Sequence, residues 1–353
     1  NSILNHFTDE NCYELINLLN IIINDSKVKK SLLKECANLE KELYNNSVDI
    51  QPLLSCNNNT LIEVLLCGYL NDDHFFTYPL PNLIFPRDIA VCFGNTILIT
   101  WAKKHVRRRE NIISKYIFTH SELFNDLNVF DFHSNFPELS IEGGDVLIFD
   151  DKRICIGISE RTPLESVSSL APIFYKEGFE KIIAIEMPKQ RALMHLDTIF
   201  TKISSDEVLV YPPILEGSFN NGVNNIYLFE KKSSLPKKYN MNIIAFLKQD
   251  NVKIKFIKCG SDRLIQQQRE QWTDGANSFA LAPGKIIGYN CNLHTLKELE
   301  NNGYEIITSE EYNENYKKYN KANKKFVVTI KGLELLRGRG GPRCLTLPIF
   351  RIN

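Results

Sequence analysis

Three glycines, a proline and two arginines lead to a cysteine in the segment from Gly338 to Cys344 (GRGGPRC). Glycine and proline shape a backbone that can approach a bound molecule closely, and neighbouring cations favour the thiolate form of a cysteine. The segment therefore predicts a nucleophilic Cys344 at the end of a loop. A glycine-rich surface loop before a buried structural cysteine would explain the same residues, and the segment alone does not separate the two readings.

A second pattern is His195-Leu196-Asp197, which lies among apolar residues. We expect a β-strand here, in which residues two apart point to one face, so an imidazole and a carboxylate would lie side by side. Such a pair suits proton transfer and the binding of a cation. A histidine that is satisfied inside the core would give the same pattern.

Two further segments carry carboxylates. In Ile141–Asp145 (IEGGD), Glu142 and Asp145 bracket two glycines that permit a sharp turn beside a ligand. In Leu80–Asp88 (LPNLIFPRD), an Arg-Asp pair lies inside an apolar stretch. Each segment alone is also explained by an acidic turn or a buried ion pair. Taken together, paired carboxylates select a planar cation such as guanidinium, and a thiolate beside that cation has an electrophilic carbon to attack.

A β-rich scaffold must position these residues, and one unit of it can be read between residues 146 and 186. Strands at Val146–Phe149 and Ile154–Ile158 precede Thr162–Glu165, a capping box with proline at the first helical position. Gly178 stands where the helix should end, and a strand at Lys181–Glu186 completes a ββαβ unit.

Less regular copies of this unit are expected elsewhere. They are Ile84–Trp101 with a turn at Gly94-Asn95, His195–Tyr211, and Phe279–Tyr289 followed by a helix at Thr295–Asn302 and a strand at Tyr304–Thr308. A last strand is expected at Leu345–Ile352, and the Asn/Lys/Tyr-rich stretch Tyr312–Lys325 is interpreted as a mobile loop, a helix edge or a solvated face. Repeats too small to bury their own faces pack around a shared axis or stack as an array. The predicted fold class is therefore α/β, an α/β-propeller of ββαβ blades around a central active site, over residues 76–353. Residues 1–75 are predicted to form a helical module.

The composition excludes several classes of protein. Lys plus Arg and Asp plus Glu number 42 each, so no net field would hold a nucleic acid or an anionic membrane. No apolar run approaches the ~20 residues that cross a bilayer, and no secretory signal opens the sequence, so we expect a cytoplasmic protein. The nine cysteines fall at no metal-type spacing, which predicts no metal site and no disulfide framework.

Five segments resemble, in order, the motifs of arginine deiminases, guanidine-modifying enzymes with the pentein fold. They are PNLIFPRD, IEGGDVLIFD, MHLDTIFT, REQWTDGAN and GRGGPRCLTLPIFR. The resemblance implies hydrolysis of L-arginine to citrulline and ammonia through a covalent thiouronium intermediate, with no metal or organic cofactor. A homodimer is compatible with it.

The resemblance also assigns roles to residues, motif by motif. It implies that Cys344 is the nucleophile, that His195 and Glu142 move protons, and that Asp88 and Asp197 hold the guanidinium nitrogens. The residues that it implies for substrate binding are Asn82, Arg107, Arg161, Asp145, Gly341 and Arg339. In the run of three arginines that contains Arg107, the assignment could move by one residue. Trp272 and Asp274 are expected to provide structural support.

The sequence departs from the family pattern in two ways. Pro86 replaces a threonine and Ile89-Ala90 replaces Pro-Phe, which alters the geometry around Asp88. A pentein has five blades, whereas about four and a closing strand can be placed, so a first blade is expected upstream or is absent. Hydrolysis of agmatine or of a methylated arginine, and an inactive pentein-fold binding protein, are the alternatives. Arg161 and Arg339 argue against agmatine, which has no carboxylate, and the retained chemical residues argue against an inactive protein.

Overall fold

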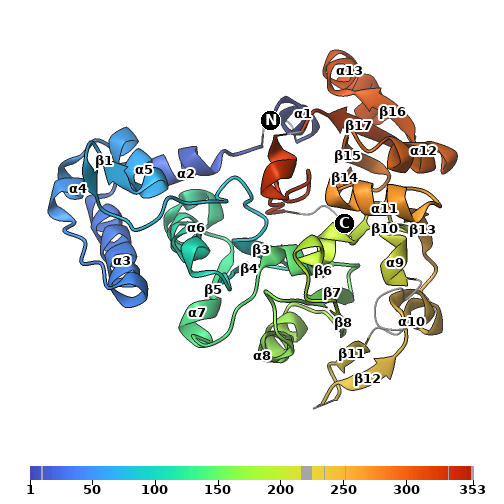
Figure 1. Ribbon diagram of the computed structural model, residues 1–353, viewed down its shortest axis with the longest axis horizontal. Helices are drawn as coiled ribbons and strands as arrows, with labels where there is room; N and C mark the ends of the chain where they lie inside the picture. The colour runs from blue at the N-terminus through green and yellow to red at the C-terminus, as the bar shows by residue number, and fades with distance from the viewer. Residues whose placement is uncertain (9–10, 216–224, 234, 251, 333, 351–353) are drawn as a thin grey trace. The chain divides into compact units, whose positions relative to one another are not determined.

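The computed structural model describes all residues except 9–10, 216–224, 234, 251, 333 and 351–353. The chain folds as two compact units, one of residues 13–143 and 348–353 and the other of residues 1–12 and 144–347. Each unit combines helices with β-strands, so the predicted α/β class is confirmed (Figure 1). Within the described ranges, no helix has both the length and the apolar character that crossing a membrane requires.

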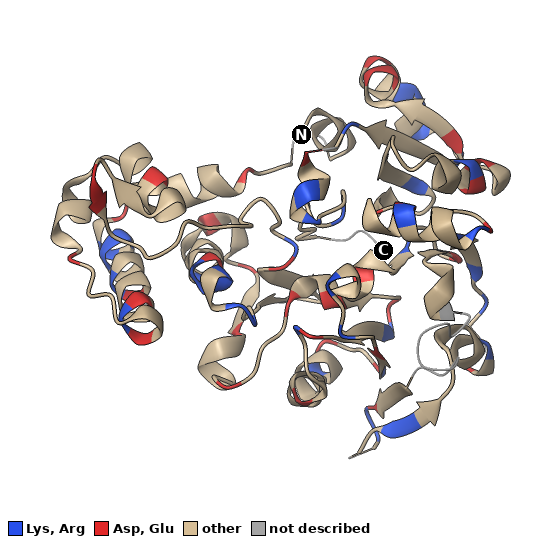
Figure 2. Cartoon of the chain, in the orientation of Figure 1, with Lys and Arg blue, Asp and Glu red and all other residues tan. Residues whose placement is uncertain are grey.

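The first part of the unit of residues 13–143 is helical. Its elements are α2 (Leu15–Ile22), α3 (Ser26–Tyr44), α4 (Gln51–Ser55) and α5 (Asn58–Cys67), then a hairpin of β1 (Tyr69–Leu70) and β2 (Asp73–His74). Asp25 caps α3, because its carboxylate accepts hydrogen bonds from the N–H groups of Lys27 and Val28. Both signs of charge lie along α3 (Figure 2), while Leu32 and Leu33 on its other side are fully buried.

The second part of this unit is a three-stranded sheet. Its elements are β3 (Ala90–Phe93), β4 (Thr96–Ile99), α6 (Arg108–His120), β5 (Asn128–Asp131) and α7 (Phe132–Asn135), with short 3₁₀ turns at His105–Arg107 and Glu122–Phe124. β3 and β4 are antiparallel and β5 returns parallel to β4, as predicted for a ββαβ unit. Gly94 makes the predicted turn with φ +52°. The strand predicted from Ile84 begins only at Ala90; Pro86, which lies among turns, has no N–H to donate to a sheet.

The largest sheet of the unit of residues 144–347 has the strand order β12-β11-β8-β7-β6. Its elements are β6 (Val146–Ile148), β7 (Arg153–Ile158), α8 (Leu164–Lys176), β8 (Lys181–Glu186), β11 (Asn225–Glu230) and β12 (Lys237–Asn240). The ββαβ unit read from residues 146–186 is confirmed, and Gly178 has the expected positive φ of +99°. The predicted capping box is wrong, because α8 has no side-chain cap and the hydroxyl of Thr162 donates to Asp145 instead.

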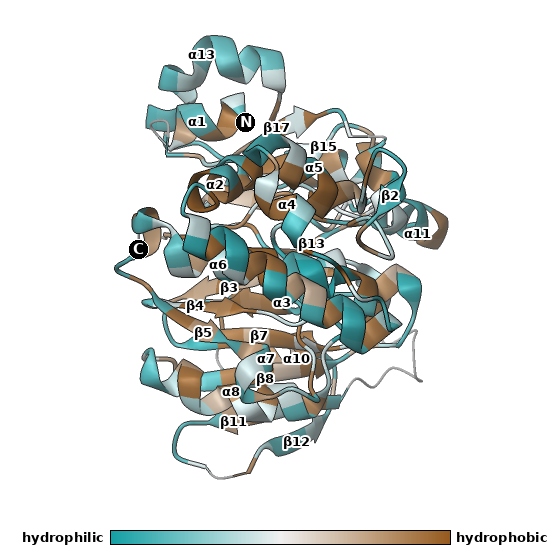
Figure 3. Ribbon diagram, turned by 90° about the vertical axis from the view of Figure 1, so that its left-hand side faces the viewer, coloured by the Kyte–Doolittle hydropathy of each residue, from teal (hydrophilic) through white to brown (hydrophobic). Residues whose placement is uncertain are grey.

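Two smaller sheets repeat the pattern. The first contains β9 (Phe200–Lys202), β10 (Glu207–Val210) and β13 (Lys255–Lys258), with α9 (Pro212–Leu215) and α10 (Ile243–Gln249) between β10 and β13. The second contains β14 (Phe279–Ala282), β15 (Lys285–Tyr289), α12 (Leu293–Asn301), β16 (Glu305–Thr308) and β17 (Phe326–Ile330). In both, an antiparallel pair is followed by a strand that returns in parallel. The ββαβ unit is confirmed as one continuous segment in two sheets, those of β3–β5 and of β6–β8. In the other two sheets the same strand pattern forms, but further strands and helices lie between the antiparallel pair and the parallel strand: β11 and β12 before β13, and β16 before β17. Strands β3, β4 and β7 appear largely apolar in Figure 3.

Near the C-terminus, the helix alternative holds for Tyr312–Lys325, whereas the strand predicted at Leu345–Ile352 is wrong over the described residues 345–350, residues 351–352 lying outside them. The stretch Tyr312–Lys325 lies mostly in helix α13 (Ser309–Lys321), which Thr308 caps and which packs against α1 (Ser2–Phe7). Its Asn and Lys content hides the helix signal, although Tyr312 and Tyr319, two turns apart, are buried in the core. Residues 345–350 form no strand: the N–H groups of Leu345 and Thr346 donate within turns to the carbonyls of Gly341 and Arg343, and Pro348 has no N–H to offer to a sheet.

Candidate active site

Cys344 is buried at the end of the glycine-rich loop, with 5% of its surface exposed. The loop follows a 3₁₀ turn (Leu335–Gly338), and the N–H of Cys344 donates to the carbonyl of Gly341 at 3.0 Å. The thiol lies 3.9 Å from Oδ2 of Asp197 and 3.5 Å from Oδ1 of Asn277. The structure therefore brings the predicted nucleophile beside one of the two carboxylates predicted to hold the guanidinium.

Gly341 is where the loop approaches its neighbour most closely. A Cβ added at Gly341 would lie 2.4 Å from Oδ1 and 2.6 Å from Cβ of Asn277. Real side chains do not approach so closely, so the loop reaches Asn277 only because this position is glycine. The prediction that Gly341 lines the substrate site is compatible with this position and stays a prediction.

The segment His195–Asp197 is not the expected strand. His195 is extended, but Leu196–Thr198 forms a 3₁₀ turn, and the carbonyl of His195 accepts hydrogen bonds from the N–H and the hydroxyl of Thr198. Both His195 and Asp197 are buried, with 3% and 0% of their surfaces exposed. The two residues are therefore buried as expected, but the reason given for it, the two-residue alternation of a β-strand, is wrong.

The carboxylate of Asp145 contacts this segment and accepts hydrogen bonds from three groups of the protein. Its Oδ1 accepts the N–H of Leu196 at 3.0 Å, and its Oδ2 accepts the hydroxyls of Ser159 at 2.7 Å and Thr162 at 2.6 Å. Burial raises the pKa of Asp145 to about 7, against the lowering effect of His195. The contacts show a carboxylate that fixes the His195–Asp197 segment, while its predicted role in substrate binding stays untested.

Two other predicted residues of this unit are arginines. The N–H of Arg161 donates to Oγ of Ser159 at 2.9 Å, and its side chain is partly exposed. Arg339 is buried, donates from one terminal nitrogen to the carbonyl of Ala192 at 2.8 Å, and stacks over the ring of Trp272.

The sequence reasoning missed two residues near Cys344. Asn277 accepts from the N–H of Cys344 at 3.3 Å and donates to the carbonyl of Asp197 at 3.0 Å, so it links the two. Arg343 pairs with Asp197, with 3.4 Å between Nε and Oδ2. Both lie inside the quoted motifs, at the end of REQWTDGAN and directly before the cysteine. Their position in the motifs was the only signal that could have found them.

The unit of residues 13–143 contains a separate cluster of predicted residues around Arg107. The guanidinium of Arg107 lies 2.8 Å from Asp88, 2.9 Å from Glu110 and 3.7 Å from Glu142. Burial acts to lower the pKa of Arg107, but the three carboxylates raise it above its ordinary value. Arg107 is thus bound by carboxylates of its own unit, and its predicted role at the substrate's α-carboxylate stays a prediction.

The remaining predicted residues of this unit support the same cluster. The N–H of Asn82 donates to Glu110 at 2.9 Å, and Glu142 accepts the N–H of Lys103 at 3.1 Å. Next to Glu142, a Cβ added at Gly143 would lie 2.1 Å from the carbonyl oxygen of Arg87, so only glycine fits there. The glycines of the IEGGD segment therefore allow close packing of the chain on itself.

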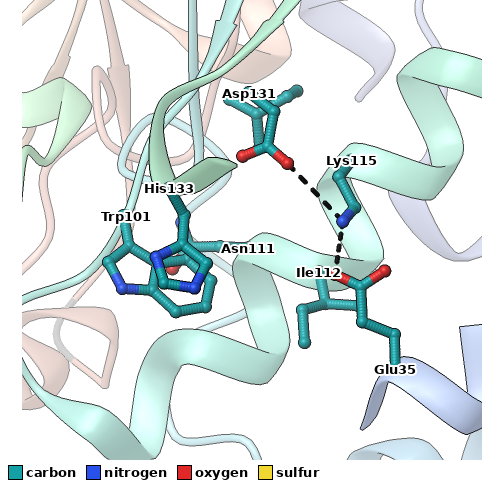
Figure 4. A pocket seen from close by; sticks show the side chains of 8 residues that line it. Glu35, Trp101, Asn111, Ile112, Lys115, Asp131 and His133 are labelled. Carbon is teal, nitrogen blue, oxygen red and sulfur yellow. Dashed lines mark hydrogen bonds and ion pairs between the residues drawn. The ribbon is translucent and has the colours of Figure 1, made fainter. Parts of the chain in front are cut away.

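A small cavity in this unit lies beside Trp101. The rings of Trp101 and His133 stack with centroids 3.8 Å apart, and Lys115 pairs with Glu35 and Asp131 (Figure 4). The cavity holds about 10 Å³, whereas pockets for small molecules measure about 300–1,000 Å³. These charged and aromatic side chains therefore join α3, α6 and β5 and do not form a substrate pocket.

Comparisons with known proteins agree with the motifs. A sequence profile described as arginine deiminase matches residues 28–351. The chain is 34% identical over 288 residues to the arginine deiminase of Listeria monocytogenes, and the aligned region covers 79% of this chain and 63% of that protein. It is 32% identical over 352 residues to that of Listeria welshimeri, which covers 92% of this chain and 80% of that protein. The chain thus spans less than two thirds of the length of the first relative.

Solved structures share the fold at low sequence identity. One is the product-bound N-terminal domain of ArgZ, an arginine dihydrolase of cyanobacteria, with a TM-score of 0.50, 16% identity and coverage of 77% of this chain and 78% of that chain. Another is a cysteine-to-alanine mutant of AgrE with L-arginine, with a TM-score of 0.52, 15% identity and coverage of 78% and 31%. At these identities the likeness shows the fold alone.

Proposed function

Because the chain belongs to the arginine deiminase family, we propose that it hydrolyses the guanidinium group of L-arginine to give L-citrulline and ammonia. The observation that carries this proposal is the buried approach of the Cys344 thiol to the Asp197 carboxylate, at 3.9 Å. A carboxylate at this position can accept the N–H groups of a guanidinium while the sulfur faces its carbon. Proteins named arginine deiminase among the relatives, and an AgrE structure with L-arginine, support the choice of substrate.

The proposed reaction has two covalent steps. The thiolate of Cys344 first bonds to the guanidinium carbon, and one C–N bond breaks as ammonia leaves with a proton from His195. An S-alkylthiouronium intermediate remains. His195 then takes one proton from water, and the water oxygen bonds to the same carbon. The C–S bond breaks to return the thiolate, and the second water proton passes to solvent as the C=O of citrulline forms. Arginine and water give citrulline and ammonia, so no oxidant or reductant is consumed.

Carboxylates stabilise the positive charge in this scheme. Asp197 faces the sulfur and would hold the substrate and the intermediate in a buried setting, where a preorganised charge acts strongly. The motifs assign guanidinium binding to Asp88 and proton transfer to Glu142. At the other end of the substrate, the motifs assign Asn82, Arg107, Arg161 and Arg339 to the α-amino-acid group.

We also propose the architecture that the sequence predicts. Residues 76–353 would form an α/β-propeller of ββαβ blades around the active site, and residues 1–75 a helical module. The repetition of one strand pattern in four sheets supports this proposal, because such units bury their faces by packing on one another.

The test is citrulline formation from L-arginine by the chain and by a Cys344→Ala variant. We expect the variant to lose activity by a factor of about 10³ or more, because the covalent step is removed. Cys67→Ala, which alters an exposed cysteine, serves as the matched control and should retain activity. Mass spectrometry of quenched reactions should show an adduct on Cys344.

Two outcomes would overturn the proposal. Normal citrulline formation by Cys344→Ala would exclude the mechanism. Release of ammonia from agmatine or a methylated arginine, but not from arginine, would show a different guanidine hydrolase.

A further inference from the structure

Arg339 is held in an uncommon backbone conformation. Its φ is +61°, a region that side chains other than Asn and Asp rarely adopt, and its exposed fraction is 6%. The guanidinium carbon lies 4.2 Å from the centre of the Trp272 ring, and one terminal nitrogen donates to the carbonyl of Ala192. Within the part of the chain that the structure describes, Nε and the other terminal nitrogen have no hydrogen-bond partner. The guanidinium of Arg339 is therefore held in place, while the N–H groups of Nε and of one terminal nitrogen can still donate to a ligand.

Asp274 provides the opposite charge. It is 2% exposed, and neither carboxylate oxygen accepts a hydrogen bond from any described residue. Burial raises the pKa of Asp274 to about 7, and Arg339 is the charge that acts most strongly to lower it. In turn, burial lowers the pKa of Arg339, and Asp274 is the charge that most opposes this. Each group is thus the main electrostatic support of the other.

Both partners of Arg339 come from the end of one helix. Trp272 is the last residue of α11 (Leu264–Trp272), and Asp274 follows two residues later with φ +56°. Gln271, which precedes Trp272 in α11, donates to the carbonyl of Ala192 at 2.6 Å, and Arg339 donates to the same oxygen. The end of α11 therefore provides the ring and the carboxylate and fixes the accepting carbonyl.

We propose that Trp272 and Asp274 are positioning residues that hold the guanidinium of Arg339 ready for the α-carboxylate of the substrate. A guanidinium that lies over the face of an indole can keep edge N–H groups available, and these bind a carboxylate in the plane of the guanidinium. Because Arg339 is ordered in advance, less conformational entropy is lost when the substrate binds. Trp272 and Asp274 would thereby set the preference for an amino acid over a guanidine without a carboxylate. This inference rests on the proposed function.

The first test separates KM from kcat for L-arginine. We expect Asp274→Asn and Trp272→Ala to raise KM about tenfold or more and to change kcat less than about threefold, because Arg339 contacts a part of the substrate that does not react. Trp272→Phe keeps an aromatic face and should restore most of the affinity. Asparagine also tolerates the positive φ at position 274, and Asp262→Asn, at an exposed carboxylate, is the matched control.

A double-mutant cycle tests whether Asp274 acts through Arg339. In an Arg339→Ala background, Asp274→Asn should cause no further rise in KM. A further rise of the same size would overturn the inference, because Asp274 would then act independently of Arg339. An equal loss with agmatine, which keeps the amine but has no carboxylate, would overturn it as well and would assign Asp274 to the substrate's ammonium group. Unchanged KM values in both single variants would also contradict it.

Fluorescence tests the stack without any reaction. Trp101 and Trp272 are the only tryptophans of the chain, so Trp101→Phe leaves Trp272 as the only indole signal. Trp272 is 51% exposed and lines a surface hollow of about 380 Å³. Adding Arg339→Ala should shift its emission and its quenching by acrylamide. If the chain forms no citrulline from arginine, the proposed function fails; if emission does not respond to Arg339→Ala, the stack itself is excluded.

Discussion

In the unit of residues 13–143, buried carboxylates share one fixed cation, because the guanidinium of Arg107 lies 2.8 Å from Asp88 and 2.9 Å from Glu110. In the unit of residues 144–347, Asp145 is as deeply buried but accepts hydrogen bonds from one backbone N–H and two hydroxyls. A cation compensates a buried carboxylate by charge, whereas neutral donors compensate it only by their dipoles. Burial raises the pKa of Asp145 to about 7 against the lowering effect of His195, and it also raises the pKa of Glu110, where Arg107 is the charge that opposes it most.

The comparison also teaches how each region can be damaged. Removing a shared cation leaves several charges buried without compensation, which is strongly destabilising. Removing a carboxylate that accepts neutral donors leaves those donors without a partner, which costs less for each group. The two regions should therefore differ in the size and in the pH dependence of their responses.

The largest effect is expected from Arg107→Ala. We expect a loss of about 3–5 kcal/mol in the free energy of unfolding, because Asp88 and Glu110 lose their shared cation. Urea denaturation monitored by circular dichroism would measure it. Arg108→Ala, in the same run of arginines, should cost about 1 kcal/mol or less, since Arg108 is half-buried and lies 5.1 Å from the centre of the Trp101 ring. Equal losses in the two variants would show that the shared pairing contributes nothing.

A smaller effect is expected from Asp145→Ala. We expect a loss of about 2–3 kcal/mol, because the N–H of Leu196 and the hydroxyls of Ser159 and Thr162 lose their acceptor. The turnover of arginine should also fall, since this contact holds the segment that contains His195. Asp151→Ala, at an exposed aspartate, is the control. A variant with unchanged stability and turnover would refute the positioning of the segment by Asp145.

The last effect is a change of stability with pH at Asp274. Its pKa is raised from 3.8 to about 7 in the folded chain, so the folded state binds the proton more tightly. The stability from this proton is complete below about pH 4 and is lost as pH rises through about 7. Asp274→Asn removes that loss. The stability of the variant relative to the wild type should therefore increase as the pH is raised from 4 to 8. A difference that stays constant over this range would show that the pKa is not raised.

The three neighbouring arginines show where motif reasoning reached its limit. Arg107 pairs with Asp88, whereas Arg109 pairs with Glu40 in α3 and donates to the carbonyl of Tyr78. No spacing rule separates the two, because both are buried and both meet carboxylates. The sequence could show a basic run, which lies at the start of α6, but the partners come from segments distant in the chain.

The HLD segment makes the same point from the opposite direction. The sequence correctly indicated that His195 and Asp197 lie in an apolar, buried region, yet it predicted a strand where a 3₁₀ turn occurs. Local residue types favour burial, but the turn depends on Asp145, which accepts the N–H of Leu196 from 51 residues away. A contact over that separation leaves no periodic signal in the chain.

The sequence by itself determined the family and predicted the ββαβ unit and the residues that could attack and bind a guanidine. The family depends on motifs that occur in a fixed order along the chain. The secondary-structure unit depends on local patterns of apolar, polar and turn-forming residues, which a short segment already contains. Only the tertiary structure decided that Asn277 links Cys344 to Asp197, that Arg107 is bound by carboxylates, and that Arg339 rests on Trp272 with Asp274 near it. Burial removes water as an alternative partner, so each of these groups is governed by the neighbours that packing brings to it.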